Sequence, residues 1–244
     1  MAEPRTAIVT GSGKRVGREI AQALLDDGWE VVGHVHHDGD DPPGGSIKIA
    51  ADLGRADSAD RIFDAARGLP PVRLLVNNAA RFSWDGFSDF KAGEFDAHMA
   101  VNVRAPAQLI ERFASLHDGV ADASIVNLLD SKVAAPNPDF LSYTLSKQAL
   151  AGLTELAARA LASKGIRVNG IAPGLMLRSS GQSEENFETM HGHNPLRRGV
   201  RPEEIIGAIR YLVDARCVTG QVLVIDSGQR FLGLDRDVQF LGAQ

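Results

Sequence analysis

A tyrosine and a lysine four residues apart, Tyr143 and Lys147, have the residue types and the spacing that catalysis can use. On a helix, residues i and i+4 lie on one face, so the phenol hydroxyl and the ammonium group would be neighbours. A free tyrosine has a pKa of about 10, and a nearby cation favours its ionised form. Tyr143 is therefore predicted to donate a proton to a substrate that receives a hydride. The same spacing also occurs by chance in exposed helices, so the position of the pair in the fold must decide whether it is catalytic.

A glycine-containing turn, Thr10–Gly17, follows the first apolar run and precedes a segment of helical spacing. Glycines at such a junction let the backbone approach a pyrophosphate, and the free N–H groups of the following helix point at that anion. The spacing differs from the usual G-x-G-x-x-G because Val16 occupies the position of the third glycine. The turn predicts a dinucleotide site formed by Gly11, Lys14, Arg15, Val16 and Gly17.

The end of the second apolar run indicates which dinucleotide binds. NAD-specific domains commonly place an acidic residue there, about 20 residues after the glycines, to hold the ribose 2′-hydroxyl. Here the run is followed by His36 and His37, and no acid occurs before Asp38. The histidines can meet a 2′-phosphate together with Lys14 and Arg15, which favours NADP(H). Two alternatives remain: the histidines only occupy a polar strand edge, or the Asp38 carboxylate weakens phosphate binding.

Apolar, β-branched runs alternate with segments of helical spacing along the whole chain. The runs predict strands at Thr6–Thr10, Glu30–Val35, Ser46–Ala50, Arg73–Val76, Ser124–Leu129, Arg167–Ile171 and Gln221–Ile225. The segments between them predict helices at Arg15–Asp27, 57–67, 93–117, 141–163 and 202–213. Such alternation indicates an α/β fold with a Rossmann-type, doubly wound parallel sheet. We expect a single domain over residues 1–244.

The composition is that of an ordinary globular protein, with 44% hydrophobic and 23% charged residues and a formal net charge of −5. A mildly acidic chain gives no electrostatic reason to expect nucleic acid or an anionic membrane as a partner. Cys217 is the one cysteine, and no Cys/His spacing resembles a metal site, so we expect no metal. The sequence has no secretory signal and no stretch apolar enough to cross a bilayer, which predicts a cytoplasmic protein.

Taken together, the motifs resemble those of the short-chain dehydrogenase/reductase family, and the match spans nearly the whole chain. The motifs that carry the resemblance are Thr10–Gly17, Asp52-Leu53, Asn77–Ala80, Asn102, Tyr143 with Lys147, Pro173-Gly174 and Thr219-Gly220. The resemblance implies that Asp52 and Leu53 flank the adenine of the cofactor. It also implies that a short segment lines the cleft beside the nicotinamide ribose, namely Asn78, Ala79 and Ala80.

The resemblance further implies roles for the later motifs. Asn102 would hold a helix kink and a water that links Lys147 to solvent. Lys147 would bind the hydroxyls of the nicotinamide ribose and tune Tyr143. Pro173 and Gly174 would close over the nicotinamide carboxamide.

Two positions depart from the usual family pattern. Arg15 replaces the second glycine of the turn T-G-x-x-x-G-x-G, and Asp130 replaces the serine thirteen residues before the tyrosine. Both substitutions resemble the pteridine reductase branch, as does Phe82, because an aromatic ring there stacks the pterin against the nicotinamide. An arginine commonly follows the strand-end histidines of that branch, whereas His37 stands there in this sequence. The resemblance implies NADPH as cofactor and a pterin-like substrate that contacts Phe82, Asp130 and Tyr143.

The aspartate has a consequence that follows from charge alone. Ketone reduction builds negative charge on oxygen, which a serine hydroxyl stabilises and an ionised Asp130 repels. At ~4 Å and an effective dielectric near ~20 the repulsion is about 4 kcal/mol, which is roughly a thousandfold in rate. Reduction of a C=N bond instead requires a proton on nitrogen, so Asp130 favours a C=N or pterin-like substrate. The alternatives are a protonated Asp130 that donates as a serine does, or Ser131 in that role.

Residues 175–195 are expected to form the substrate loop, because a long polar stretch without obvious secondary structure is usually functional or mobile. Trp84, close to Phe82, is expected either to belong to the substrate wall or only to cover the rim of the cleft. The resemblance also implies a symmetric homotetramer that pairs through the helices at 93–117 and 141–163.

Three functions remain open for the chain. The first is an NADPH-dependent, pteridine-reductase-like enzyme, and the second is a carbonyl or 3-oxoacyl reductase of the same family. The third is a cofactor-binding protein without turnover. The complete set of Asn102, Tyr143 and Lys147 argues against the third function.

Overall fold

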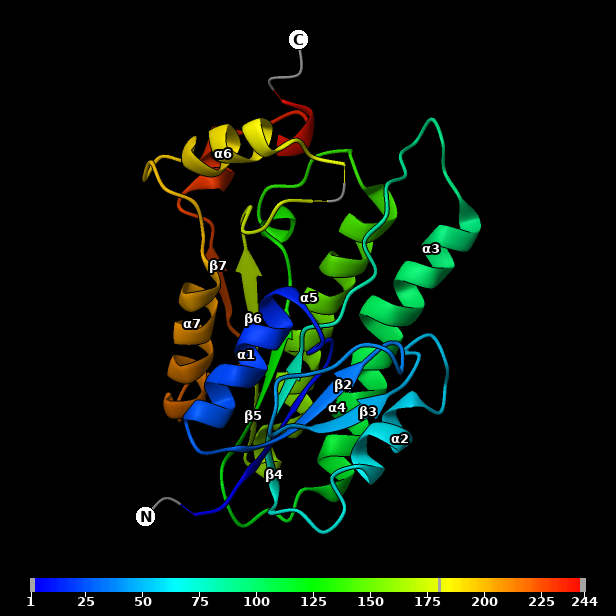
Figure 1. Ribbon diagram of the computed structural model, residues 1–244, viewed down its shortest axis with the longest axis vertical. Helices are drawn as coiled ribbons and strands as arrows, with labels where there is room; N and C mark the ends of the chain where they lie inside the picture. Colours follow the sequence, from blue (N-terminus) through cyan, green and yellow to red (C-terminus); the bar gives the residue numbers. More distant parts are fainter. Residues whose placement is uncertain (1–2, 180, 242–244) are drawn as a thin grey trace.

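One parallel sheet forms the centre of the protein (Figure 1). The computed structural model describes residues 3–179 and 181–241, in which the strands follow the order β3-β2-β1-β4-β5-β6-β7. The strands are β1 (Thr6–Val9), β2 (Glu30–Val35), β3 (Ile47–Ala50), β4 (Val72–Asn77), β5 (Ala123–Leu128), β6 (Ile166–Pro173) and β7 (Val222–Ile225). The order reverses between β1 and β4, which confirms the predicted doubly wound sheet. In such sheets ligands bind at the carboxyl ends of the strands, at this switch point.

Helices cover both faces of the sheet. One layer contains α1 (Arg15–Asp26) and α7 (Pro202–Asp214), and the other contains α2 (Ser58–Asp64), α4 (Ala105–Leu116) and α5 (Leu141–Leu161). Side chains alternate along β1, so Ile8 packs into the layer of α4 and α5 while Ala7 and Val9 pack into the layer of α1 and α7. Because both faces are buried, the strands read in the sequence as continuous apolar runs.

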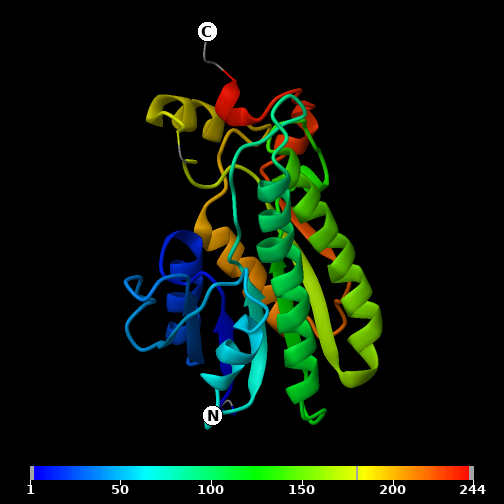
Figure 2. The same cartoon turned by 90° about the vertical axis from the view of Figure 1, so that its right-hand side faces the viewer.

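A π-helical turn interrupts the helix expected at 93–117. The segment consists of α3 (Ala92–Met99), the π turn η1 (Ala100–Arg104) and α4, and Figure 2 shows it lying alongside α5. Such turns are frequent at functional sites. The turn carries Asn102, whose Oδ1 accepts a hydrogen bond from the Arg81 N–H (2.8 Å). The Asn102 Nδ2 donates to the Arg81 carbonyl (3.0 Å) and to Ser146 Oγ on α5 (2.9 Å). The turn therefore joins the segment after β4 to α5.

The first turn of α5 is fixed by a buried carboxylate from the loop after β4. Phe140 precedes the helix in the left-handed conformation, with a φ of 57°. Asp85 is fully buried, and its carboxylate accepts hydrogen bonds from the backbone N–H (2.9 Å) and the hydroxyl of Ser142. Since Tyr143 is the next residue, these bonds fix where its side chain begins.

A chain of buried amide and hydroxyl groups attaches the middle of α5 to the sheet. Asn77 Nδ2 on β4 donates to Asn127 Oδ1 on β5 (2.8 Å), and Asn127 Nδ2 donates to Thr154 Oγ1 on α5 (2.9 Å). Thr154 in turn donates to the Leu150 carbonyl within the helix (2.8 Å). Buried hydrogen bonds of this kind specify one position of a helix on its sheet.

The carboxyl end of the sheet is covered by the last part of the chain (Figure 1). The stretch 175–195 was expected to lack regular structure, and this is wrong, because it contains α6 (Glu184–Gly192); its residue 180 lies outside the described residues. The chain also forms short 3₁₀ turns, namely η2 (Ser131–Val133), η3 (Ala162–Lys164), η4 (Gln229–Leu232) and η5 (Val238–Phe240). The last of these contacts α6. None of the helices in the described residues has the length and apolarity to span a membrane.

Candidate active site

Asp130, Tyr143 and Lys147 meet at the carboxyl end of β5. Asp130 lies in the loop between β5 and η2, and its Oδ2 accepts a hydrogen bond from the Tyr143 hydroxyl (3.0 Å). Lys147 donates from Nζ to the carbonyl of Leu128, the last residue of β5 (2.7 Å), and this nitrogen lies 5.7 Å from the centre of the Tyr143 ring. Tyr143 and Lys147 are buried, whereas Asp130 is half-buried at the wall of a cavity. The structure therefore brings the three predicted catalytic side chains together.

The electrostatics of the tyrosine correct the sequence interpretation. A lysine cation was expected to favour the ionised phenol, but the pKa of Tyr143 is raised well above its usual value. Burial is the main cause, and the negative charge of the hydrogen-bonded Asp130 adds to it. Tyr143 thus holds its proton more firmly than a free tyrosine does. Its hydroxyl is a donor that needs a neighbour to replace the proton it gives away.

Asp130 is that neighbour. Burial raises the pKa of the Asp130 carboxyl, while the backbone N–H and the ammonium group of Lys132 act in the opposite direction. Burial also lowers the pKa of Lys147 to about 8, against the opposing effect of the Asp130 charge. The site therefore contains a carboxyl group with a raised proton affinity in hydrogen-bond contact with a phenol.

A second cavity of about 460 Å³ lies at the switch point between β1 and β4. It is lined by most of the residues predicted to hold a dinucleotide, namely Gly11, Lys14, Arg15, Val16, Gly17, His36, His37, Asp52, Leu53, Asn78, Ala79 and Ala80. The predicted residues Pro173 and Gly174, together with Tyr143 and Lys147, line the adjoining cavity of about 500 Å³. Four residues line both cavities, namely Arg15, Val16, Asn78 and Ala80. The two cavities thus form one cleft.

The glycine turn has the shape that a phosphate cradle requires. A Cβ atom on Gly17 would overlap the carbonyl of Gly11, and Gly11 itself has a φ of 70°. The Gly11 N–H donates to His34 Nδ1 (3.2 Å), and the Nε2 of the same ring lies 2.9 Å from the Ala51 carbonyl. This imidazole fixes the turn relative to the end of β3. Arg15 has a φ of 52° at the position where the family has glycine. The cavity, its glycines and its cations fit a dinucleotide.

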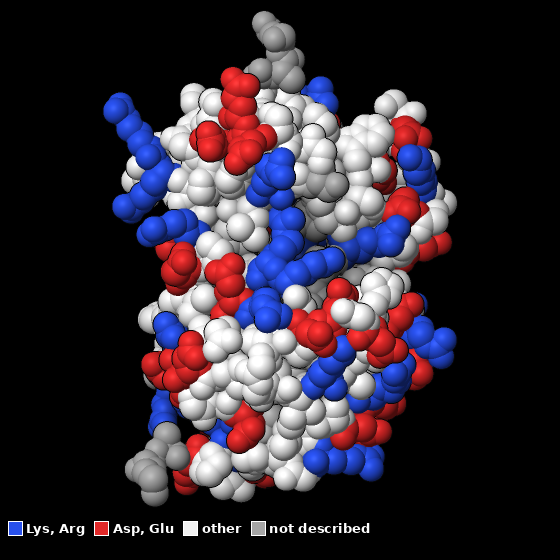
Figure 3. Space-filling model, viewed as in Figure 1, with Lys and Arg blue, Asp and Glu red and all other residues white. Residues whose placement is uncertain are grey.

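Basic side chains gather at the cleft. Figure 3 shows Lys and Arg groups along a hollow across the middle of this face, below α6. Lys14, Arg15 and Arg81 line the dinucleotide cavity. Cations there match the charge of phosphate groups.

The acidic residue that the loop after β2 contributes to this cavity is not Asp38, the one that the sequence indicated. Asp40 lines the cavity, and a Cβ atom on Gly13 would lie 3.2 Å from the Asp40 Cβ. Asp38 does not line it; instead, its carbonyl accepts a hydrogen bond from Lys48 (2.5 Å). The sequence offers three acids at 38–41, and only the path of this polar loop decides which one faces the cleft.

Phe82 lies beside Tyr143. Its ring stacks on Phe140 with centroids 4.4 Å apart, and it meets the Tyr143 ring edge-to-face at 4.7 Å. It remains 44% exposed and lines the 500 Å³ cavity, so part of the ring is open to a ligand. Trp84 is also exposed but does not line this cavity, which favours the alternative that it only covers the rim.

The motif comparison missed residues that close the same cavity. They come from the loop after Asp130 and from the C-terminal part of the chain, and include Lys132, Asn137, Gln229, Arg230, Leu234, Asp237 and Val238. No sequence motif marked the C-terminal ones. Lys132 follows Asp130 by two residues, and this spacing was the one available signal.

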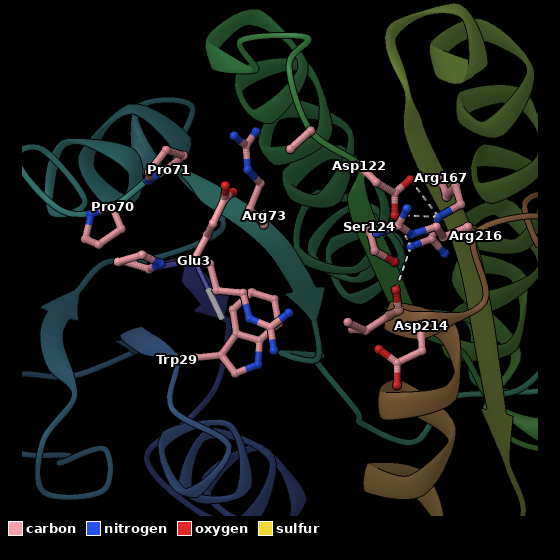
Figure 4. Close-up of a pocket in the computed structure, with 14 residues that line it drawn as sticks. Glu3, Trp29, Pro70, Pro71, Arg73, Asp122, Ser124, Arg167, Asp214 and Arg216 are labelled. Atoms are coloured by element: carbon pink, nitrogen blue, oxygen red, sulfur yellow. Dashed lines mark hydrogen bonds and ion pairs between the residues drawn. The ribbon is translucent and has the colours of Figure 1, made fainter. Parts of the chain in front are cut away.

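A larger cavity of about 680 Å³ lies at the opposite, amino-terminal edge of the sheet (Figure 4). None of the predicted site residues lines it. Arg73 there forms two hydrogen bonds with Asp118 (2.8 Å each), and Arg167 pairs with Asp122 (2.8 Å) and donates to carbonyls at the end of α7. Both guanidinium groups are already engaged with carboxylates, and Arg167 also with carbonyls at the end of α7. We therefore do not place the reaction in this cavity.

Comparison with known proteins identifies the family of the chain. Residues 11–230 match the family model described as Enoyl-(Acyl carrier protein) reductase. The chain is 31% identical to carbonyl reductase (NADPH) 2 of Sus scrofa, over 91% of this chain and 95% of that protein. It is 30% identical to pteridine reductase 1 of Leishmania tarentolae, with the same coverage of each chain. The crystal structure of FolM alternative dihydrofolate reductase 1 from Brucella canis with NADP superposes with a TM-score of 0.87. That match is 35% identical and covers 93% of this chain and 94% of the other.

The pKa of Lys147 predicts how stability depends on pH. The value falls from 10.5 to about 8 on folding, so between these values the unfolded chain binds a proton that the folded chain lacks. Stability therefore rises with pH in this window, while below pH 8 the buried cation destabilises the fold in full. Relative to Lys147→Met, the free energy of unfolding of the wild type should rise by about 1.5 kcal/mol from about pH 8 to about pH 9.5.

Urea unfolding of the protein without cofactor measures this difference. Lys164→Met is the control, because Lys164 is exposed and its removal should give a flat difference across the same range. Parallel stability curves for the wild type and Lys147→Met would contradict the prediction.

Proposed function

Because the chain belongs to the short-chain dehydrogenase/reductase family, whose members are NAD(P)-dependent oxidoreductases, we propose that it is an NADPH-dependent reductase of a pterin-like C=N bond. The observation that carries the proposal is the hydrogen bond of 3.0 Å between Tyr143 and a carboxyl group, Asp130, in place of the usual serine. The pteridine reductase relative and the two Brucella FolM structures with NADP support it.

The proposed mechanism follows from the proton affinities at the site. A nicotinamide held by Lys147, Pro173 and Gly174 would supply the hydride that the carbon of the C=N bond receives. Tyr143 gives its hydroxyl proton to the nitrogen and takes a replacement from protonated Asp130, which recovers its proton from solvent. The raised pKa of Asp130 keeps this proton available at higher pH than in a free aspartate. On a ketone, by contrast, an ionised Asp130 would repel the charge that builds on oxygen.

The cofactor would lie along the cleft with its phosphates at the glycine turn. Gly11 and Gly17 would approach the pyrophosphate, and Lys147 would bind the nicotinamide ribose from α5. A 2′-phosphate would meet Lys14, His36 and His37, which supports NADP(H). The Asp40 carboxylate in the same cavity opposes this preference.

The proposed substrate is a flat, nitrogen-rich ring that stacks on Phe82. The exposed part of that ring lies beside Tyr143, and Asp130 is hydrogen-bonded to the same tyrosine. Stacking of an aromatic pair contributes about 1 kcal/mol beyond the area that it buries. A ring held there would place its C=N edge near the hydroxyl that donates the proton.

A carbonyl or 3-oxoacyl reductase is the second candidate. A protonated Asp130 can donate a hydrogen bond to a ketone oxygen as a serine does, and its raised pKa favours that form. The carbonyl reductase of Sus scrofa and the 3-oxoacyl reductases among the relatives support this alternative. The homotetramer and the cytoplasmic location remain predictions. Leu156 on α5 is 67% exposed, as a helix that pairs with another subunit requires.

The substrate class is tested by comparing 7,8-dihydrobiopterin with a panel of small ketones, with NADPH as reductant. The wild type should reduce the pterin with a kcat/KM at least about tenfold higher than that for any ketone. Asp130→Ser should lower pterin reduction at least about tenfold, because a serine hydroxyl cannot replace the proton of Tyr143 as a carboxylic acid does. Tyr143→Phe should lose roughly 100- to 10,000-fold in kcat on both. A wild type that reduces ketones and no pterin would establish the second candidate instead.

The stacking role of Phe82 predicts a selective effect on substrate. Phe82→Ala should raise the KM for the pterin by about fivefold or more and leave NADPH binding within about twofold, since Phe82 does not line the dinucleotide cavity. Phe87→Ala is the matched control, because Phe87 belongs to the same loop, is 82% exposed and does not line the cavity. Equal KM values for the two variants would remove Phe82 from the substrate site.

Cofactor preference is tested at Asp40. Asp40→Ala should tighten NADPH binding about fivefold, because a carboxylate at ~4 Å from a phosphate in solvent costs about 1 kcal/mol. NADH binding should change by less than about twofold, as measured by fluorescence titration. Asp38→Ala should leave both affinities unchanged, because Asp38 does not line the cavity. Loss of NADH binding in Asp40→Ala would show that this carboxylate holds a ribose hydroxyl and that NAD is the cofactor.

A further inference from the structure

The C-terminal cap, defined here as residues 229–241, forms one wall of the substrate cavity. It is attached to the loop between β5 and α5 by contacts with Asp139, whose Oδ2 accepts hydrogen bonds from Arg236 Nε and from the Asp237 N–H (2.8 Å each). Phe240 stacks on Phe140, with centroids 6.0 Å apart and planes at 15°. The cap therefore holds Asp237 at a fixed place in the wall.

Asp237 forms an ion pair with Lys132 inside this wall. The Asp237 Oδ2 lies 2.9 Å from Lys132 Nζ, and the side chains are only 14% and 8% exposed. Lys132 Nζ also donates to Asn137 Oδ1 (2.7 Å) and to the Asp139 carbonyl (3.2 Å). Lys132 therefore makes two hydrogen bonds and one ion pair inside the wall of the cavity that it lines.

The same lysine touches the catalytic aspartate through its backbone. The Lys132 N–H donates to Asp130 Oδ1 (2.9 Å), while the other carboxyl oxygen of Asp130 accepts from Tyr143 (3.0 Å). The charge of Lys132 favours ionised Asp130, and the charge of Asp237 acts on Tyr143 in the opposite sense. One neutral pair therefore places a cation and an anion next to the two groups that handle the proton.

We propose that Asp237 and Lys132 are a positioning pair that keeps Asp130 protonated in the working pH range of the enzyme. The role deepens the proposed function and rests on it. The lysine orients the Asp130 carboxyl through its N–H, and the cap carboxylate balances the lysine charge. Without that balance the lysine would hold Asp130 in its ionised form, which has no proton to pass to Tyr143.

The other charged groups near Asp130 do not replace this pair. Lys147 reaches the site from α5, and its cation is common to all the variants below. Arg15 and Arg230 line the same cavity, and Arg230 is paired with Asp226 (3.0 Å). The Asp139 carboxylate also feels the charge of Lys132, but it is paired with Arg236 (2.8 Å), so the balance at Lys132 is attributed to Asp237.

Two single substitutions separate this role from a purely structural one. Asp237→Asn leaves the Lys132 cation unbalanced, so the pKa of Asp130 should fall and the pH above which kcat declines should move down by about one unit. Lys132→Gln leaves the Asp237 carboxylate unbalanced, so the pKa of Asp130 should rise and the same limb should move up. Both variants lose the ion pair, yet their shifts have opposite signs.

The double variant Asp237→Asn with Lys132→Gln restores neutrality and should return the midpoint to that of the wild type. Arg236→Lys is the control, because it alters the neighbouring contact of the cap with Asp139 and keeps both the charge there and the pair. Its midpoint should stay at the wild-type value. Shifts of the same sign in the two single variants, or no shift in either, would overturn the proposal.

A measurement that needs no substrate separates this proposal from the proposed function. The ¹³C resonance of the Asp130 carboxyl, assigned by its absence in Asp130→Asn, reports the protonation of Asp130 directly in the protein with NADPH. Opposite shifts of this titration without any reduction of pterin would reject the substrate and keep the pair. Pterin reduction with titrations that move together would reject the pair and keep the substrate.

Discussion

The hydrogen bond between Tyr143 and Asp130 joins two groups whose pKa values are both raised by burial. It joins two separate elements of the fold, the loop after β5 and the start of α5. A misplacement of about 1 Å in such a contact can cost on the order of a hundredfold in rate. Much of the fold around α5 therefore serves to hold that distance. Asp85 fixes its first turn, Asn102 bonds to it from the π turn, and Asn127 ties its middle to the sheet.

The alternation of apolar runs and helical segments was enough to predict the sheet, because every strand is buried on both faces. The i, i+4 spacing likewise placed Tyr143 and Lys147 together. It failed for the proton affinity of the tyrosine, since burial, the main cause, and the neighbouring Asp130 both arise from tertiary structure. Lys147 turns its ammonium group to a strand carbonyl instead. The helix α6 was missed because Met190 is its one buried residue among those described, so it leaves no apolar stripe to read.

The cleft has two parts, and sequence motifs predict the residues of only one of them. The dinucleotide part is built from short motifs at the ends of strands, and the motifs identified nearly all of its walls. The substrate part takes its walls from the loop after β5 and from the C-terminal cap, which share no motif. Its polar groups are engaged with one another, as in the pair of Lys132 and Asp237. The sequence does not reveal this ion pair, because Lys132 and Asp237 are separated by more than a hundred residues.

Arg15 lies where the two parts meet and carries the left-handed backbone conformation that glycine adopts freely. For a residue with a side chain this conformation costs roughly 1–2 kcal/mol. Glycine at this position would relieve the strain and remove the guanidinium group that faces both cavities. At this residue, therefore, the substitution that would stabilise the fold would also remove a group available for ligand binding. Selection for thermal resistance alone would favour glycine here and remove one of the cations that line the cleft.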